Sequence, residues 1–176
     1  MSTPARLLVL LLLSGPLIAC GTRLDVPEGR GPERLETTQQ SRDGASWRSA
    51  FDVQLHPEVL EVHLRVRLVT DGKLGRRILS DTSEAWERET ERIWSGNLAL
   101  VAGDRRWPIH LDLEFTNDRP HHVVIVRDSR SRVDQLNWSR WTPPSAVAHE
   151  VGHMLGAFDE YAGGDLDPSS ARVVKG

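Results

Sequence analysis

Two histidines and a glutamate near the C-terminal end of the chain have the spacing of a metal site. Residues 146–161 read AVAHEVGHMLGAFDEY and contain His149, Glu150 and His153 in the pattern H-E-x-x-H. On a helix, residues four apart lie on the same face, so both imidazoles can reach one ion. Glu150 is rotated by about 100° from His149 and can therefore reach a water molecule beside the ion rather than the ion itself.

The residues after the second histidine could complete such a site. Gly156 is the expected end of the helix, because glycine adopts the left-handed C-cap conformation at small steric cost. A chain reversal there could bring Asp159 to the ion as a third ligand, and three ligands with one open position suit catalytic zinc. Glu160 is the alternative third ligand, although capping or solvation is its more ordinary role. Tyr161 could stabilise a transition-state oxyanion or pack under the turn.

A simpler interpretation of the same stretch is an amphipathic helix with two solvated histidines and a glycine C-cap. That interpretation requires neither Glu150 nor Asp159, so we favour a metal site. A ligand set of histidines with no sulfur donor suits zinc. The chain has a single cysteine, which excludes a multi-cysteine metal site and an internal disulfide. The net charge of -3 offers no general basic field, so we expect no nucleic-acid partner.

Residues 149–159, HEVGHMLGAFD, resemble the elongated zinc-binding motif of the metzincin metallopeptidases. In the variant H-E-x-x-H-x-x-G-x-x-D the segment is similar to the snapalysins, which are small neutral proteases. The resemblance implies zinc held by His149, His153 and Asp159, with Glu150 as general base and proton shuttle and a peptide or protein as substrate. Metzincins also carry a Met-turn after the third ligand, and residues 160–176 contain no methionine. The alternative is therefore a zinc-binding surface protein without catalysis, acting as a binding module.

Residues 1–20 are typical of an export signal. Arg6 precedes an apolar run over residues 7–13, which is shorter than the roughly 20 residues of a membrane-spanning helix. Residues 17–20, LIAC, resemble the lipobox of bacterial lipoproteins, although an ordinary secretory signal is the alternative. The resemblance implies a signal peptide over 1–19, a lipid anchor on Cys20, and a place in the bacterial cell envelope. Gly21, where an aspartate would favour the inner membrane, favours the outer membrane or cell surface.

The rest of the chain divides into a tether and one folded domain. Residues 20–46 contain few aliphatic side chains and predict a flexible tether, and the metallopeptidase domain is expected over 47–176 as a monomer. Residues 59–69 and 109–115 alternate as half-buried strands do, 98–101 form a further strand, and the apolar run 123–126 predicts a buried strand.

The helices that accompany these strands complete the predicted fold. Asp81 and Glu84 indicate the start of a helix that ends at Trp94, with Trp86, Ile93 and Trp94 on its core-facing stripe. Residues 127–141 predict a polar loop, and Thr142 is expected to cap the final helix. The fold class is then α+β, with a zincin-like mixed sheet and a C-terminal active-site helix. His121 and His122 are expected at an exposed corner, with a second metal site as the alternative.

Overall fold

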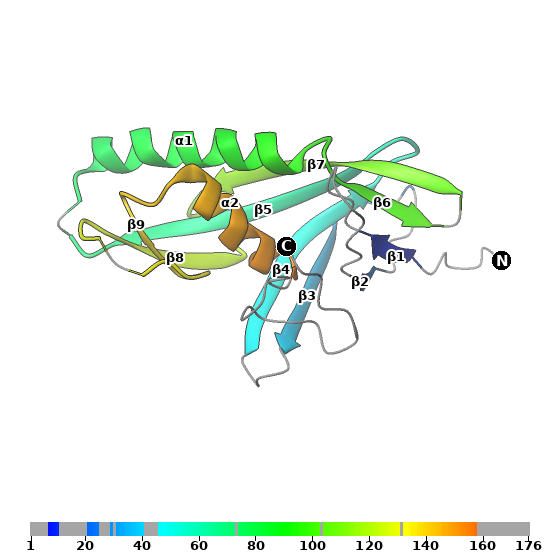
Figure 1. The fold of residues 1–176 in the computed structure, drawn as a ribbon, viewed down its shortest axis with the longest axis horizontal. Coiled ribbons are helices and arrows are strands. Elements are labelled where there is room, and N and C mark those ends of the chain that lie inside the picture. The colour runs from blue at the N-terminus through cyan, green and yellow to red at the C-terminus, as the bar shows by residue number, and fades with distance from the viewer. Residues whose placement is uncertain are drawn as a thin grey trace, which may run out of the picture.

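The computed structural model describes residues 7–10, 21–24, 29, 31–40, 46–72, 74–102, 104–130 and 132–157, and it has a mixed α+β fold. The predicted α+β class is therefore confirmed. The strands are β1 (Leu7–Leu10), β2 (Gly21–Leu24), β3 (Glu33–Gln40), β4 (Ser46–Leu55), β5 (Leu60–Thr70), β6 (Ala99–Ala102), β7 (Arg105–Phe115), β8 (His122–Arg127) and β9 (Asn137–Ser139). The helices are α1 (Arg76–Trp94) and α2 (Pro144–Met154), and Figure 1 shows their arrangement.

Four parallel strands form the part of the sheet that leads to α2. Their order is β7-β5-β8-β9, and α2 follows β9 in the chain. Val66 of β5 is paired with Phe115 of β7 and with His122 of β8, so these two neighbours lie on opposite edges of β5. β4 is antiparallel to the first part of β5, on the same edge as β8. β4 and β8 therefore divide one edge of β5 between them.

Beyond this fork, β4 pairs with β3 alone among the described strands. All eight residues of β3 are paired antiparallel with β4, from Glu33 opposite Val53 to Gln40 opposite Ser46. Figure 1 shows this β3–β4 hairpin turning away from the long axis of β5 and passing the C-terminal end of α2. The hairpin corrects the prediction of a flexible tether over residues 20–46, because Glu33–Gln40 form an edge strand.

The core lies between the sheet and the two helices. The predicted alternation of β5 is confirmed, since Leu60, Val62, Leu64 and Val66 are all buried. Trp86 of α1 is buried among aromatic rings, with its ring centroid 5.2 Å from that of Trp138. α1 packs on β7 and on α2. None of the helices in the described ranges is long and apolar enough to cross a membrane.

Three local predictions about the helices and the loop were wrong. α1 begins at Arg76 after an extended Gly75, so the Asp81 capping signal lies inside the helix. The residue before the first turn of α2 is Pro143, and Thr142 is buried, with its hydroxyl accepting a hydrogen bond from the Ser139 N–H. The predicted polar loop 127–141 also contains β9.

Two predictions about β8 were wrong as well. The apolar run 123–126 is not buried throughout, because Val123 and Ile125 are 38% and 40% exposed while Val124 and Val126 are fully buried. β8 therefore has one face in the core and one face outside. His121 and His122 are 2% and 4% exposed and do not form an exposed corner.

Candidate metal centre on the C-terminal helix

α2 is held against the core by one face and carries the candidate ligands elsewhere on its surface. Val147, Val151 and Met154 are fully buried, whereas His149 is exposed and His153 is partly buried. Gly152 allows a close approach of α1, because a Cβ atom there would lie 3.0 Å from Cζ2 of Trp94. The helix is thus fixed at a short distance from α1.

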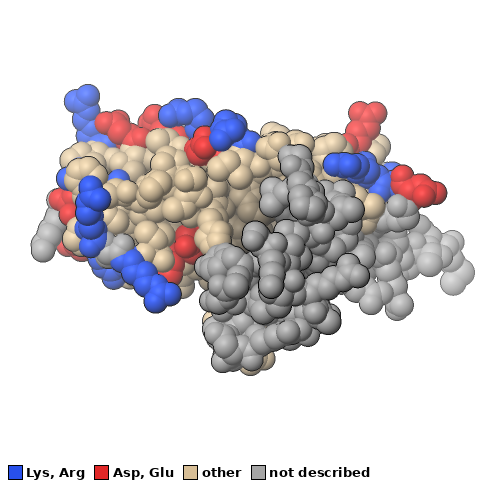
Figure 2. Space-filling view, viewed as in Figure 1, with Lys and Arg blue, Asp and Glu red and all other residues tan. Residues whose placement is uncertain are grey.

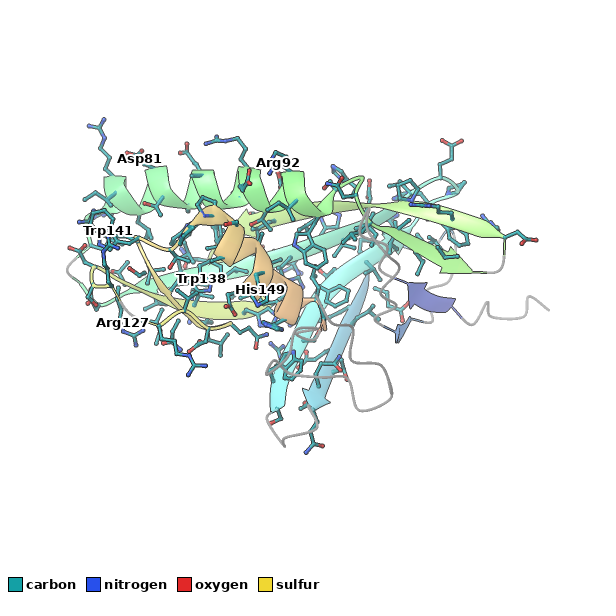
Figure 3. All side chains as sticks on the ribbon, in the orientation of Figure 1. Asp81, Arg92, Arg127, Trp138, Trp141 and His149 are labelled. Atoms are coloured by element: carbon teal, nitrogen blue, oxygen red, sulfur yellow. The ribbon has the colours of Figure 1, made fainter. Side chains whose placement is uncertain are left out.

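The two histidines of the motif lie together, as their spacing predicts. Their ring centroids are 4.9 Å apart, and the rings are nearly perpendicular at 86°. Figure 3 shows His149 on α2, where this helix passes in front of the sheet. Glu150 lies between the two histidines in sequence and is partly buried. The described part of the site is therefore two imidazoles and one neighbouring carboxylate.

A backbone carbonyl orients the second imidazole. Nδ1 of His153 lies 3.0 Å from the carbonyl oxygen of Ala157. A carbonyl can only accept, so Nδ1 carries the proton and Nε2 is the unprotonated nitrogen of the neutral ring. Histidines that bind metals usually donate their second N–H to such a carbonyl or carboxylate. This contact gives His153 the tautomer that ligates through Nε2.

The turn that supplies this carbonyl has the hydrogen bonds of a Schellman motif. The Gly156 N–H donates to the His153 carbonyl, and the Ala157 N–H donates to the Gly152 carbonyl. Gly156 has φ of 93°, which confirms the prediction that glycine ends this helix. The remaining candidates, Asp159, Glu160 and Tyr161, lie outside the described residues. Within the described ranges, no group of three or more histidine, cysteine, aspartate or glutamate side chains could hold a metal ion.

Three tryptophans donate hydrogen bonds to carbonyls at the start, middle and end of the α2 segment. Trp86 bonds the Thr142 carbonyl at 3.0 Å, Trp94 bonds the Ala148 carbonyl at 3.0 Å, and Trp47 bonds the His153 carbonyl at 3.1 Å. The prediction that Trp86 and Trp94 face the core is confirmed, since Trp86 is buried and Trp94 packs against the core. The role of Trp47 was missed, and no local pattern around it indicates that role.

A second ionisable cluster lies at the fork between β4 and β8. Nε2 of His121 lies 3.1 Å from Oδ1 of Asp52, and Nη2 of Arg65 lies 2.6 Å from Oδ2 of the same carboxylate. Burial acts to raise the pKa of Asp52, but the hydrogen bonds from His121 and Arg65 outweigh it and lower that pKa overall. Burial lowers the pKa of His121 despite the neighbouring Asp52.

His122 is buried at the same fork between β4 and β8. Its Nε2 lies 3.0 Å from the carbonyl oxygen of Ala50, and the Arg48 guanidinium donates to the His121 carbonyl. Burial lowers the pKa of His122 to about 4. These contacts join β4 to β8 and account for both histidines without a metal.

One further histidine and two further tryptophans make contacts that do not involve His149 or His153. On the outer face of the sheet, Nδ1 of His63 lies 2.8 Å from Oδ2 of Asp112. Trp138 is fully buried, whereas Trp141 is 49% exposed and has the Arg140 guanidinium 3.8 Å from its ring centroid. Figure 3 shows Trp141 near the far end of the molecule from the C-terminal end of α2.

Comparison with known proteins gives no assignment for this chain. No protein-family model matches it, and no match was found among curated proteins or solved structures. The candidate site is therefore interpreted from its own residues.

Proposed function

We propose that this chain is a zinc-dependent endopeptidase whose reaction centre lies on the exposed side of α2. The observation that carries the proposal is the pair His149 and His153, with ring centroids 4.9 Å apart and Glu150 between them in sequence. The donor set fits zinc, since imidazole nitrogen is a preferred zinc ligand and the His153 tautomer presents Nε2. Asp159 is the proposed third ligand, with Glu160 as the alternative, and Tyr161 is a proposed oxyanion donor.

The protein residues would divide the chemistry among them. Zinc bound at this position would supply a Lewis acid and lower the pKa of water to about 7. The Glu150 carboxylate takes a proton from the water that attacks the peptide carbonyl. It then donates that proton to the leaving amine nitrogen, so that the carboxylate is regenerated. The imidazoles of His149 and His153 would hold the zinc ion in place throughout.

We propose that the mixed sheet and the two helices of the described residues have a zincin-like arrangement, with α2 as the active-site helix. We also propose that the chain is anchored through lipid on Cys20 in the bacterial envelope and acts there on peptides or proteins as a monomer. Incorporation of labelled fatty acid into the chain, lost in Cys20→Ala, tests the anchor separately from the enzymatic proposal.

The test of the enzymatic proposal is hydrolysis of casein and of a mixed peptide library by the purified chain. Zinc content is measured on the same samples. Glu150→Gln should keep the zinc and lose at least about 100-fold in rate, because general-base catalysis contributes about that much or more. Glu84→Gln on α1 is the matched control, since Glu84 contacts Ser80 and lies outside the site.

Two results would overturn the proposed mechanism. Hydrolysis that survives both Glu150→Gln and zinc chelation would refute the assigned role of Glu150. Stoichiometric zinc, lost in His149→Ala, without turnover of any peptide would favour the zinc-binding module instead.

A further inference from the structure

We propose that Trp47 is a positioning residue for His153, and that docking of the β3–β4 hairpin and zinc binding on α2 stabilise each other. The inference rests on the metal-binding part of the proposed function and does not depend on peptide hydrolysis. The inference adds to the metal centre the β3–β4 hairpin, in which Trp47 precedes His153 by about a hundred residues.

Trp47 contacts His153 in two ways. Its indole N–H donates to the His153 carbonyl at 3.1 Å, and its ring meets the imidazole edge-on, with centroids 5.8 Å apart and planes at 73°. The first contact fixes the backbone of the ligand residue, and the second limits the rotation of its side chain. The Ala157 carbonyl holds Nδ1 of the same ring. The imidazole of His153 is thus constrained by a helix turn and by a residue of β4.

The hairpin also touches the turn that follows the ligand. The Ser49 hydroxyl is buried and donates to the Met154 carbonyl at 2.9 Å. A Cβ atom at Gly156 would lie 3.0 Å from Nε2 of Gln39 on β3 and 3.3 Å from the Ser49 hydroxyl. Both strands of the hairpin therefore pack against the C-terminal turn of α2. Figure 1 shows the hairpin passing this end of the helix.

These contacts make the two events energetically coupled. A zinc ion requires the His153 imidazole in one orientation, and the docked hairpin favours a single orientation before the ion arrives. Coupling between two binding events is reciprocal, so zinc must stabilise the docked hairpin by the same free energy by which the hairpin improves zinc binding. β3 is suited to report this effect, because it is an edge strand paired only with β4 among the described strands.

The experiment compares two tryptophan variants of the full chain. Trp47→Phe keeps an aromatic edge against His153 and removes the indole N–H. Trp94→Phe is the matched control, because it removes an equivalent N–H bond to the Ala148 carbonyl of the same helix. Zinc affinity is measured by competition with a chromogenic chelator. We expect the zinc affinity of Trp47→Phe to be about tenfold lower than that of the wild type. This is the lower end of the loss caused by removing a residue that orients a metal ligand. In Trp94→Phe we expect a change within about twofold.

Hydrogen exchange provides the reciprocal measurement. Zinc should slow amide exchange in β3 and β4 of the wild-type chain, and should slow it less in Trp47→Phe. Ser49→Ala, which removes the other bond from the hairpin to α2, should also weaken zinc binding and serves if Trp47→Phe does not fold. A merely structural Trp47 would change the unfolding free energy and leave zinc affinity unaltered.

The outcomes separate this inference from the proposed function. If the wild type and Trp47→Phe bind zinc with equal affinity, the coupling is overturned and the proposed function is not. The same holds if zinc does not slow amide exchange in the β3–β4 hairpin. A wild-type chain that binds no zinc would overturn both.

Discussion

Acid should lower the free energy of unfolding through protonation of His122, and substitution of this one side chain can isolate its contribution. His122 is buried at the fork between β4 and β8, and its Nε2 lies 3.0 Å from the Ala50 carbonyl. Burial lowers its pKa from 6.5 to about 4. Between these two values the unfolded chain binds a proton that the folded chain does not, so the free energy of unfolding falls as pH falls through this window.

The size of the effect follows from the two pKa values. The difference between 6.5 and about 4 corresponds to roughly 3 kcal/mol once the pH lies below both. Between pH 7 and pH 4.5 the expected loss is about 2 kcal/mol, because the folded-state group is only partly protonated at pH 4.5. The lowered pKa of His121 acts in the same direction, whereas the lowered pKa of Asp52 removes stability only at more acidic pH.

His122→Gln isolates the contribution of one imidazole. The glutamine amide can donate to the Ala50 carbonyl but does not titrate in this range. Urea unfolding, followed by tryptophan fluorescence at pH 7 and pH 4.5, should show a pH-dependent loss about 2 kcal/mol larger in the wild type than in the variant. His63→Gln, on the outer face of the sheet, should not remove this difference. Parallel pH dependence in wild type and His122→Gln would refute the buried, neutral state assigned to His122.

Gly152 in α2 and Gly156 in the turn that follows it lead to further predictions, both measured by urea unfolding at pH 7. Gly156→Ala should lower the free energy of unfolding by about 2 kcal/mol or more, because φ is 93° and the new Cβ would approach Gln39 to 3.0 Å. The control Gly72→Ala has φ of 82° but no atom within 4 Å, so a loss as large as that of Gly156→Ala would contradict the contact. Gly152→Ala should lower the free energy of unfolding by about 1 kcal/mol, because crowding against Trp94 exceeds the gain in helix propensity. A variant more stable than the wild type would show that α1 and α2 can move apart without loss of stability.

The elements predicted correctly are those whose own sequence pattern indicates which side chains are buried or which backbone conformation is required. Residues 59–69 alternate because one face of β5 is in the core, and the observed strand Leu60–Thr70 differs by one residue at each end. The end of α2 was predicted because a glycine with positive φ is a local requirement of the turn. β3 was missed because Leu35 is its one large aliphatic side chain, and a strand with two polar faces has no period-two signal.

The start of α1 and the two fork histidines were missed for different reasons. Asp81 and Glu84 have the residue types of a capping box, but the preceding turn packs Leu79 against the core, and this packing extends the helix back to Arg76. His121 and His122 read as a polar corner because their burial depends on β4 and β8 sharing one edge of β5. That arrangement joins segments about 70 residues apart, such as Ala50 and His122, and has no local signature.

Many of the charged side chains visible in Figure 2 lie along α1 and at the two ends of the molecule. Hydrogen bonds and a ring contact hold His153 in place. The Ala157 carbonyl orients the His153 ring, and Trp47 bonds the carbonyl of His153 itself. Each of these bonds restricts the motion of His153, so an ion bound at the proposed site would lose less binding free energy to the ordering of this side chain. A local H-E-x-x-H motif supplies the candidate ligand types, and Trp47 of β4 supplies rigidity at His153 that no local motif encodes.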